Sequence, residues 1–161
     1  MRRRWMGAAL AGLLVAGGAA GGWAVTHQGP ELRYRPYTLY DVMGRFQRFL
    51  EKLQLAGAAG NWELADWYLG DFRHVANDLV LGRASDWRGE RYHEADLTRD
   101  LLLPAFAPVE AAITARDPRA FAASMEGLAQ ACNACHAAAD HALVRIVVPQ
   151  GALHPSQRFE P

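Results

Sequence analysis

Cys132-Asn133-Ala134-Cys135-His136 is the most informative stretch of this chain, because it holds the only two cysteines among 161 residues. In a helix, residues i, i+3 and i+4 project from the same face. Cys132, Cys135 and His136 have this spacing. The stretch therefore predicts a helix that presents two thiols and one imidazole on a single side.

A C-x-x-C pair that is followed at once by histidine is the attachment pattern of a c-type haem. The two thiols become thioether links to the porphyrin, and the adjacent imidazole is placed to bind the iron from one side. We therefore predict one covalent haem c, held by Cys132 and Cys135, with His136 as an axial iron ligand.

Three other interpretations of this stretch remain open. It could be a buried pair of helical cysteines beside an unrelated histidine. A thioredoxin-like redox pair would lie at a strand-to-helix junction within a βαβ pattern, and the chain shows no such pattern. A structural zinc site needs about four ligands, whereas this segment offers three at most.

The helix that carries the motif is predicted to begin at Asp117-Pro118, with aspartate as N-cap and proline as the first helical residue. Its apolar face runs from Phe121 to the cysteines at helical spacing. The haem-attachment face is therefore continuous with the predicted core. Further members of this face are Met125, Leu128 and Ala139.

Three more helices are predicted upstream. The first begins at Thr38, which with Asp41 resembles a capping box, and it ends near residues 57–60. The second begins at Asn61 as N-cap and ends at Gly82. The third is predicted over residues 98–116, where Pro104 and Pro108 indicate either a kink or a later start near Pro104.

Four helices joined mostly by short loops predict an all-α, antiparallel four-helix bundle over residues 38–148, with the haem on the last helix. Residues 83–97 are predicted to be a long connection, in which Trp87, Tyr92 and His93 either cover an edge of the cofactor or only hold the loop in place. Residues 143–148 are predicted to form a short β-like or extended run, and residues 149–161 a C-terminal tail.

The N-terminal residues indicate export. Arginines at positions 2–4 precede an uncharged stretch over residues 5–25, the pattern of a signal peptide, with cleavage after Ala20 or Ala24. The alternative is an uncleaved membrane anchor, since this stretch is long enough to span a bilayer. Residues 26–37 are predicted to be a linker. Either alternative predicts a periplasmic protein, tethered to the inner membrane if residues 5–25 are retained.

Composition argues against several functional classes. The 17 basic and 17 acidic residues balance to a formal net charge of zero, so no nucleic-acid partner is expected. No carboxylate pair, nucleophile–base set or glycine-rich phosphate loop stands out, and we do not expect an enzyme.

The chain resembles cytochrome c′, and more narrowly a group of exported bacterial cytochrome c-like proteins with a four-helix bundle. The resemblance spans residues 38–159. The residues that carry it are Met43, Gln47, Lys52, Leu53, Ala56, Gly57, Ala59, Gly60, Asn61, Trp62, Leu64, Ala65, Cys132-Asn133-Ala134-Cys135-His136, His141, Ile146 and Pro155-Ser156-Gln157-Arg158-Phe159.

The chain departs from this pattern at two places. Related sequences often carry a histidine just before the Lys52-Leu53 pair; the nearby positions in this chain are Phe49 and Leu50. A basic residue usually follows the haem histidine by a few positions, where this chain has residues 137–140, Ala-Ala-Ala-Asp.

The resemblance implies that the first helix covers the distal side of the haem, opposite His136. Met43 on that helix is therefore the best candidate for a distal iron ligand, or for a wall residue that does not bind iron. His74 and His93 are weaker candidates, while Met125 is expected in the core. His141 is expected in solvent or near a haem propionate. Trp62, Trp67 and Tyr68 either pack on the porphyrin edge or belong to the core.

Three functions follow from these expectations. The first is an exported monohaem electron carrier that exchanges single electrons with a redox partner protein. The second is a five-coordinate haem protein of the cytochrome c′ type that binds a small gas, nitric oxide or carbon monoxide. The third is an accessory subunit of a membrane respiratory or photosynthetic complex. A homodimer is a further expectation from the resemblance.

Overall fold

The computed structural model describes residues 38–82, 94–151, 154 and 156–161. Over these residues it contains helices, turns and extended coil, and no β-strand, which confirms the predicted all-α class. Within the same ranges, no helix is both long enough and apolar enough to cross a membrane. The predicted signal or anchor, the linker and the loop with Trp87, Tyr92 and His93 lie outside the described residues.

The first two helices form the predicted antiparallel hairpin, α1 (Leu39–Ala58) and α2 (Trp62–Val80). The Thr38 side chain and Asp41 cap the start of α1 reciprocally, as a capping box does. The Asn61 side chain accepts a hydrogen bond from the Leu64 amide at 3.1 Å and begins α2. Gly60 makes the turn between the helices possible because it adopts φ 73°.

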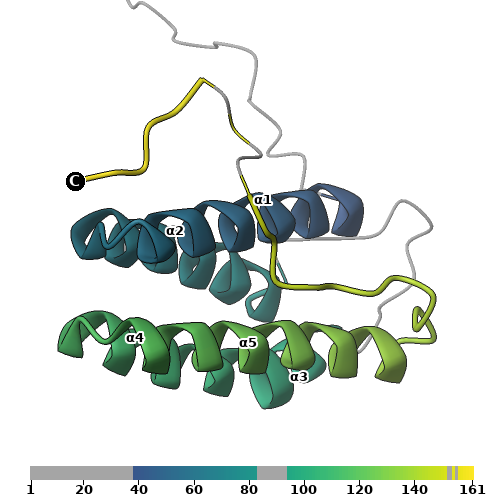
Figure 1. Ribbon diagram of the computed structural model, residues 1–161. Helices are drawn as coiled ribbons and strands as arrows, with labels where there is room; N and C mark the ends of the chain where they lie inside the picture. Colours follow the sequence, from purple (N-terminus) through teal and green to yellow (C-terminus); the bar gives the residue numbers. More distant parts are fainter. Residues whose placement is uncertain (1–37, 83–93, 152–153, 155) are drawn as a thin grey trace, which may run out of the picture. The chain divides into compact units, whose positions relative to one another are not determined.

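The last helix, α5 (Pro118–Ala138), begins as predicted, with the Asp117 side chain accepting from the amides of Arg119 and Ala120. It follows α4 (Phe106–Ala115) after a turn in which Arg116 is left-handed. Because α4 contacts α2 and α5 contacts α1, the two hairpins close into a bundle (Figure 1).

The third helical segment differs from the predicted helix over residues 98–116. It begins earlier, with α3 (Glu94–Leu97), continues as a π-helical turn η1 (Thr98–Leu102) and a 3₁₀ turn η2 (Leu103–Ala105), and only then becomes α4. The Leu103 amide donates to the Thr98 carbonyl, five residues back. Pro104, which follows, has no N–H to donate, so the regular pattern is interrupted where the proline indicated. Pro108 falls in the first turn of α4, where a missing donor costs little.

The core lies between the two hairpins. Three phenylalanine rings pack in series there: Phe46 is tilted against Phe72, and Phe72 packs edge-on against Phe106, with ring centroids 5.0 and 5.1 Å apart. Most predicted apolar positions of α1, α2 and α5 are buried there; Leu39, Met43, Phe49 and Leu64 are only partly buried, at its margin. The predicted helical stripes are therefore confirmed in their main positions.

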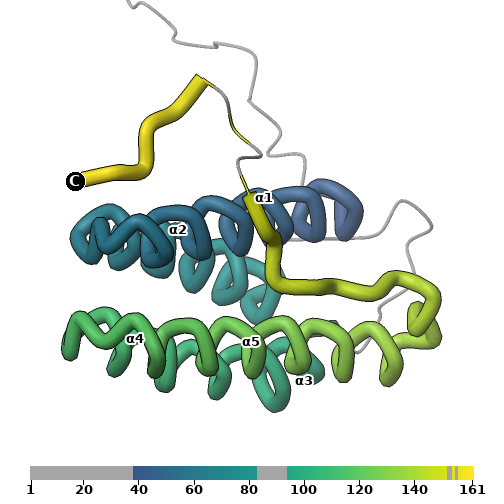
Figure 2. Tube along the Cα trace, viewed as in Figure 1, coloured from purple at the N-terminus to yellow at the C-terminus, as the bar shows by residue number. Residues whose placement is uncertain are grey.

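After α5 the chain turns and doubles back along the bundle (Figure 2). We call residues 139–149 the post-helix segment. Residues 142–143 form a turn and residue 144 a bend, and residues 145–149 have no regular secondary structure. The β-like alternative for residues 143–148 is therefore wrong, and the extended alternative is left only for residues 145–148. Val148 is buried, and in the tail Phe159 is buried and Gln157 donates to the Tyr68 hydroxyl.

Candidate functional site

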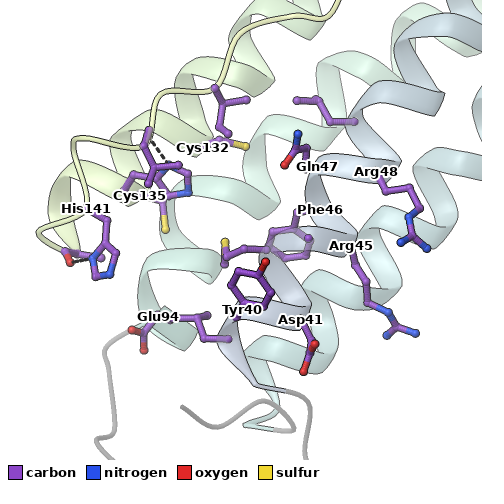
Figure 3. A pocket seen from close by; sticks show the side chains of 18 of the residues that line it. Tyr40, Asp41, Arg45, Phe46, Gln47, Arg48, Glu94, Cys132, Cys135 and His141 are labelled. Atoms are coloured by element: carbon purple, nitrogen blue, oxygen red, sulfur yellow. Dashed lines mark hydrogen bonds between the residues drawn. The ribbon is translucent and has the colours of Figure 1, made fainter. Parts of the chain in front are cut away.

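A cavity of about 880 Å³ lies beside the C-terminal half of α5 and the N-terminal half of α1 (Figure 3). Its volume falls within the range of about 300–1,000 Å³ that is usual for small-molecule and cofactor sites. The walls come from five parts of the chain, α1, α2, α3, α5 and the post-helix segment. Its lining residues are Thr38, Leu39, Tyr40, Asp41, Met43, Gly44, Arg45, Phe46, Gln47, Arg48, Leu50, Phe72, Glu94, Cys132, Cys135, His136, Ala139, His141, Val144 and Ile146.

Cys132, Cys135 and His136 all line this cavity from α5. Cys132 is buried, whereas Cys135 and His136 are half-buried. The predicted helical placement of the motif and its shared face are therefore confirmed. The two cysteines are free in the structure and form no disulfide.

The environment of the thiols does not favour thiolate chemistry. Burial, with a smaller contribution from the neighbouring Cys135, raises the pKa of the Cys132 thiol to about 12. Burial and the negative charge of Glu94 also raise the pKa of Cys135. Reactive redox cysteines have a lowered pKa, so a thioredoxin-like pair is not supported. A thioether sulfur carries no ionisable proton, so its burial has no such electrostatic cost.

The ring of His136 is oriented by the post-helix segment. Its Nδ1 lies 2.8 Å from the carbonyl oxygen of Val144. A carbonyl can only accept, so Nδ1 carries the proton and donates. In the neutral ring, the other nitrogen, Nε2, then carries the lone pair, which is the form in which histidine binds a metal. The donor set thus fits an iron-bound imidazole.

Sequence reasoning gave no role to two residues that hold this arrangement. The Asn133 side chain donates to the Ile146 carbonyl at 2.8 Å and accepts from the Ile146 amide at 2.7 Å. Ile146 and Val144 are two residues apart on the post-helix segment. The only sequence signal was an amide side chain inside the motif, and nothing in its spacing indicated a partner 13 residues later.

Met43 lines the cavity from α1. It is partly buried and packs against the core. Phe46, Leu50 and Phe72 make the rest of this wall apolar. α1 also contributes polar residues to the lining, labelled in Figure 3: Tyr40, Asp41, Arg45 and Arg48.

The other predicted candidates lie elsewhere or at the margin. Met125 is fully buried in the core and does not line the cavity. His74 is exposed and pairs with Asp78 at 3.7 Å, away from the cavity. His141 lies beyond the end of α5, exposed and among the lining residues, with its Nδ1 against the Ala139 carbonyl.

Three aromatic residues of α2, Trp62, Trp67 and Tyr68, do not line the cavity. Trp62 packs edge-on against Phe121 with centroids 5.8 Å apart, and Tyr68 is buried under the Lys52 ammonium. Trp67 is exposed. Of the two alternatives, the core interpretation holds for Trp62 and Tyr68. The cavity takes its aromatic walls instead from Phe46 and Phe72.

No group of three or more histidine, cysteine, aspartate or glutamate side chains that could hold a metal ion directly occurs in the described part of the chain. The zinc alternative therefore has no support there.

Comparisons with known proteins add no relative: no protein-family model, no curated protein and no solved structure matches the chain.

Proposed function

We propose that this protein is a monohaem c-type cytochrome of the cytochrome c′-like kind that carries single electrons. The observation that supports this most is the wall of the cavity made by Cys132, Cys135 and His136, in which His136 donates through Nδ1 and leaves Nε2 as the metal-binding nitrogen. A fortuitous cysteine pair would not require either the shared cavity or the oriented ring.

Each part of the cavity has a role in this proposal. Cys132 and Cys135 hold the porphyrin through thioethers, and His136 binds the iron. The apolar residues Phe46, Leu50 and Phe72 exclude water from the opposite wall. Arg45 and Arg48 bring positive charge to the same cavity, which suits the carboxylate groups of a haem. When bound, the haem supplies a one-electron redox couple whose potential depends on its axial ligands and on burial.

The function also needs a place where electrons enter and leave. Tyr40 and Val144 line the cavity and are 86% and 43% exposed, so the cavity reaches the protein surface. We propose that a redox partner protein docks over this opening. The proposed location is the periplasm, because the predicted signal or anchor over residues 1–25 exports the chain.

A second candidate function is the binding of a small gas, nitric oxide or carbon monoxide. The specific observation in its favour is the apolar wall of α1 and α2. Among the described apolar residues of this wall, Met43 alone carries a side-chain atom that can bind iron. If the Met43 sulfur does not reach the iron, the sixth position is left open to a gas.

Haem attachment is tested by expressing the full chain together with a c-type haem maturation system. Purified protein should stain for haem on a denaturing gel and keep its haem in acid acetone. Cys132→Ala or Cys135→Ala should leave a single, weaker thioether link. The double variant should release its haem to acid acetone, whereas the matched substitution Gln130→Ala on the exposed side of α5 should retain it. If the double variant keeps its haem in acid acetone, the proposal is refuted.

Optical spectra of the ferric and ferrous protein separate the two functions. A six-coordinate, low-spin ferrous haem that does not respond to carbon monoxide supports the electron carrier. A five-coordinate, high-spin haem that binds carbon monoxide supports the gas-binding protein instead.

A further inference from the structure

We infer that Asn133, the first residue between the two cysteines, is a positioning residue that sets the orientation of the His136 ring. The inference rests on the proposed function only in taking His136 as the iron ligand. The contacts that carry it are all between described residues.

Asn133 makes a paired contact with one residue. Its Nδ2 donates to the Ile146 carbonyl at 2.8 Å, and its Oδ1 accepts from the Ile146 amide at 2.7 Å. The side-chain amide thus satisfies both backbone groups of Ile146, as a neighbouring strand would. Both hydrogen bonds are partly buried. Without them, the amide and carbonyl of Ile146 would lack partners where water reaches them poorly, which costs free energy.

The paired contact fixes the part of the post-helix segment that His136 uses. Val144 lies two residues before Ile146, and its carbonyl is the acceptor for His136 Nδ1 at 2.8 Å. The Val144 amide also donates to the His141 carbonyl at 2.9 Å, and the His141 amide to the His136 carbonyl at 2.7 Å. The segment is therefore attached at its beginning by the helix end and at its far side by Asn133, with the Val144 carbonyl held between these points.

The side chains around Val144 give little alternative support. Leu143 is 88% exposed and Val147 is 74% exposed, so neither packs the segment onto α5. Ile146 is half-buried, and Val148 is the first buried residue of the segment. Without the Asn133 amide, the residues after Val144 would be held mainly by the packing of Ile146 and Val148, and the Val144 carbonyl would be fixed only from the side of His141.

This arrangement has a consequence for the iron. A histidine ligand whose second nitrogen donates to a fixed acceptor keeps one tautomer and one ring orientation, and it becomes a more basic ligand. A more basic axial nitrogen stabilises the ferric state relative to the ferrous state. Loss of the Asn133 contact should therefore free the Val144 carbonyl, weaken the Nδ1 bond and raise the reduction potential.

Two variants separate positioning from simple packing. Asn133→Ala removes both hydrogen bonds and part of the side-chain volume. Asn133→Leu keeps the branched shape but has neither a donor nor an acceptor, so it also removes both hydrogen bonds. A packing role would be affected by alanine and spared by leucine, whereas the positioning role is lost in both. Gln130→Ala, on the exposed side of the same helix, is the matched control.

Three measurements are made on wild type and on each variant. Hydrogen exchange of the Ile146 amide should become about tenfold faster in both Asn133 variants, the order expected for losing one or two hydrogen bonds. The reduction potential of the haem-loaded protein should rise in both. In the haem-free chain, the ring ¹⁵N shifts of His136 should report an Nδ1–H tautomer in wild type and a mixture in the variants. Gln130→Ala should change none of these.

Several outcomes would overturn the inference. Faster exchange at Ile146 with an unchanged potential and an unchanged His136 tautomer would show that the contact exists but does not orient the ring. Unchanged exchange would show that the contact is not made. If the chain never acquires haem, the proposed function fails, and the exchange and tautomer measurements still decide whether Asn133 positions His136.

Discussion

Replacing Gly57 with alanine should destabilise the protein, although alanine normally strengthens a helix. Gly57 lies in the last turn of α1, where the helix passes directly against the ring of Phe121 on α5. A Cβ atom at this position would overlap three carbon atoms of that ring. Phe121 is 2% exposed, and Trp62 packs edge-on against it, so the ring has no free space into which it could move.

The magnitude follows from two opposing effects. Alanine is favoured over glycine inside a helix by about 1 kcal/mol. Overpacking a well-packed core costs about 1–3 kcal/mol, and overlap with a confined aromatic ring belongs at the upper end of this range. The net loss in the free energy of unfolding should be about 1–2 kcal/mol, which lowers Tm by about 4–8 °C for a domain of this size.

Gly70 is the matched control. It lies within α2, is exposed, and a Cβ there would meet no atom within 4 Å. Gly70→Ala should therefore stabilise the protein by up to about 1 kcal/mol. Both variants are compared with wild type by denaturant unfolding at equal haem content. If Gly57→Ala stabilises the protein as much as Gly70→Ala does, the close approach of α1 and α5 is refuted.

Two further predictions concern the iron and the surface. Met43→Leu removes the sulfur at nearly constant volume. If Met43 binds iron, the optical spectrum of this variant should become that of a five-coordinate haem, carbon monoxide should bind, and the reduction potential should fall. Met125→Leu, in the core, should change none of these three properties. The hydrogen bond and charge of Arg73, 2.8 Å from Glu110, lower the pKa of Glu110. This ion pair is complete above the ordinary pKa of Glu110 and is lost as pH falls through the lowered pKa; in Arg73→Gln, the NMR titration midpoint of Glu110 should return to its ordinary value.

The helix ends could be predicted because their signals are local. Thr38, Asn61 and Asp117 each cap the helix that follows from within three residues. The start of the third helical segment could not be predicted in the same way. Its π turn is closed by the hydrogen bond from the Leu103 amide to the Thr98 carbonyl, just before Pro104, which has no amide to donate. No periodic pattern of apolar residues indicates this bond.

The parts of the site that could not be predicted depend on contacts far apart in the chain. Asn133 and Ile146 are ordinary residues until the post-helix segment folds back and brings them together. Gly57 and Gly70 are both glycines within helices, and the sequence does not show which of them tolerates a side chain. Only the position of the Phe121 ring excludes a Cβ atom at Gly57. The sequence left open whether Trp62 and Tyr68 of α2 pack on a cofactor or belong to the core; in the structure Phe72, and not these two residues, lines the cavity.

The two walls of the cavity therefore differ in how they are built. The wall with His136 is made from residues 132–146, which are joined by hydrogen bonds within one continuous stretch of chain. The wall with Met43 belongs to α1, and its distance from α5 depends on packing between helices, including the contact of Gly57 with Phe121. In the proposed haem protein, a change in bundle packing should thus alter the sixth iron position before it alters the His136 ligand. In Gly57→Ala, the optical signature of the sixth iron position should change while the His136 tautomer stays as it is in wild type.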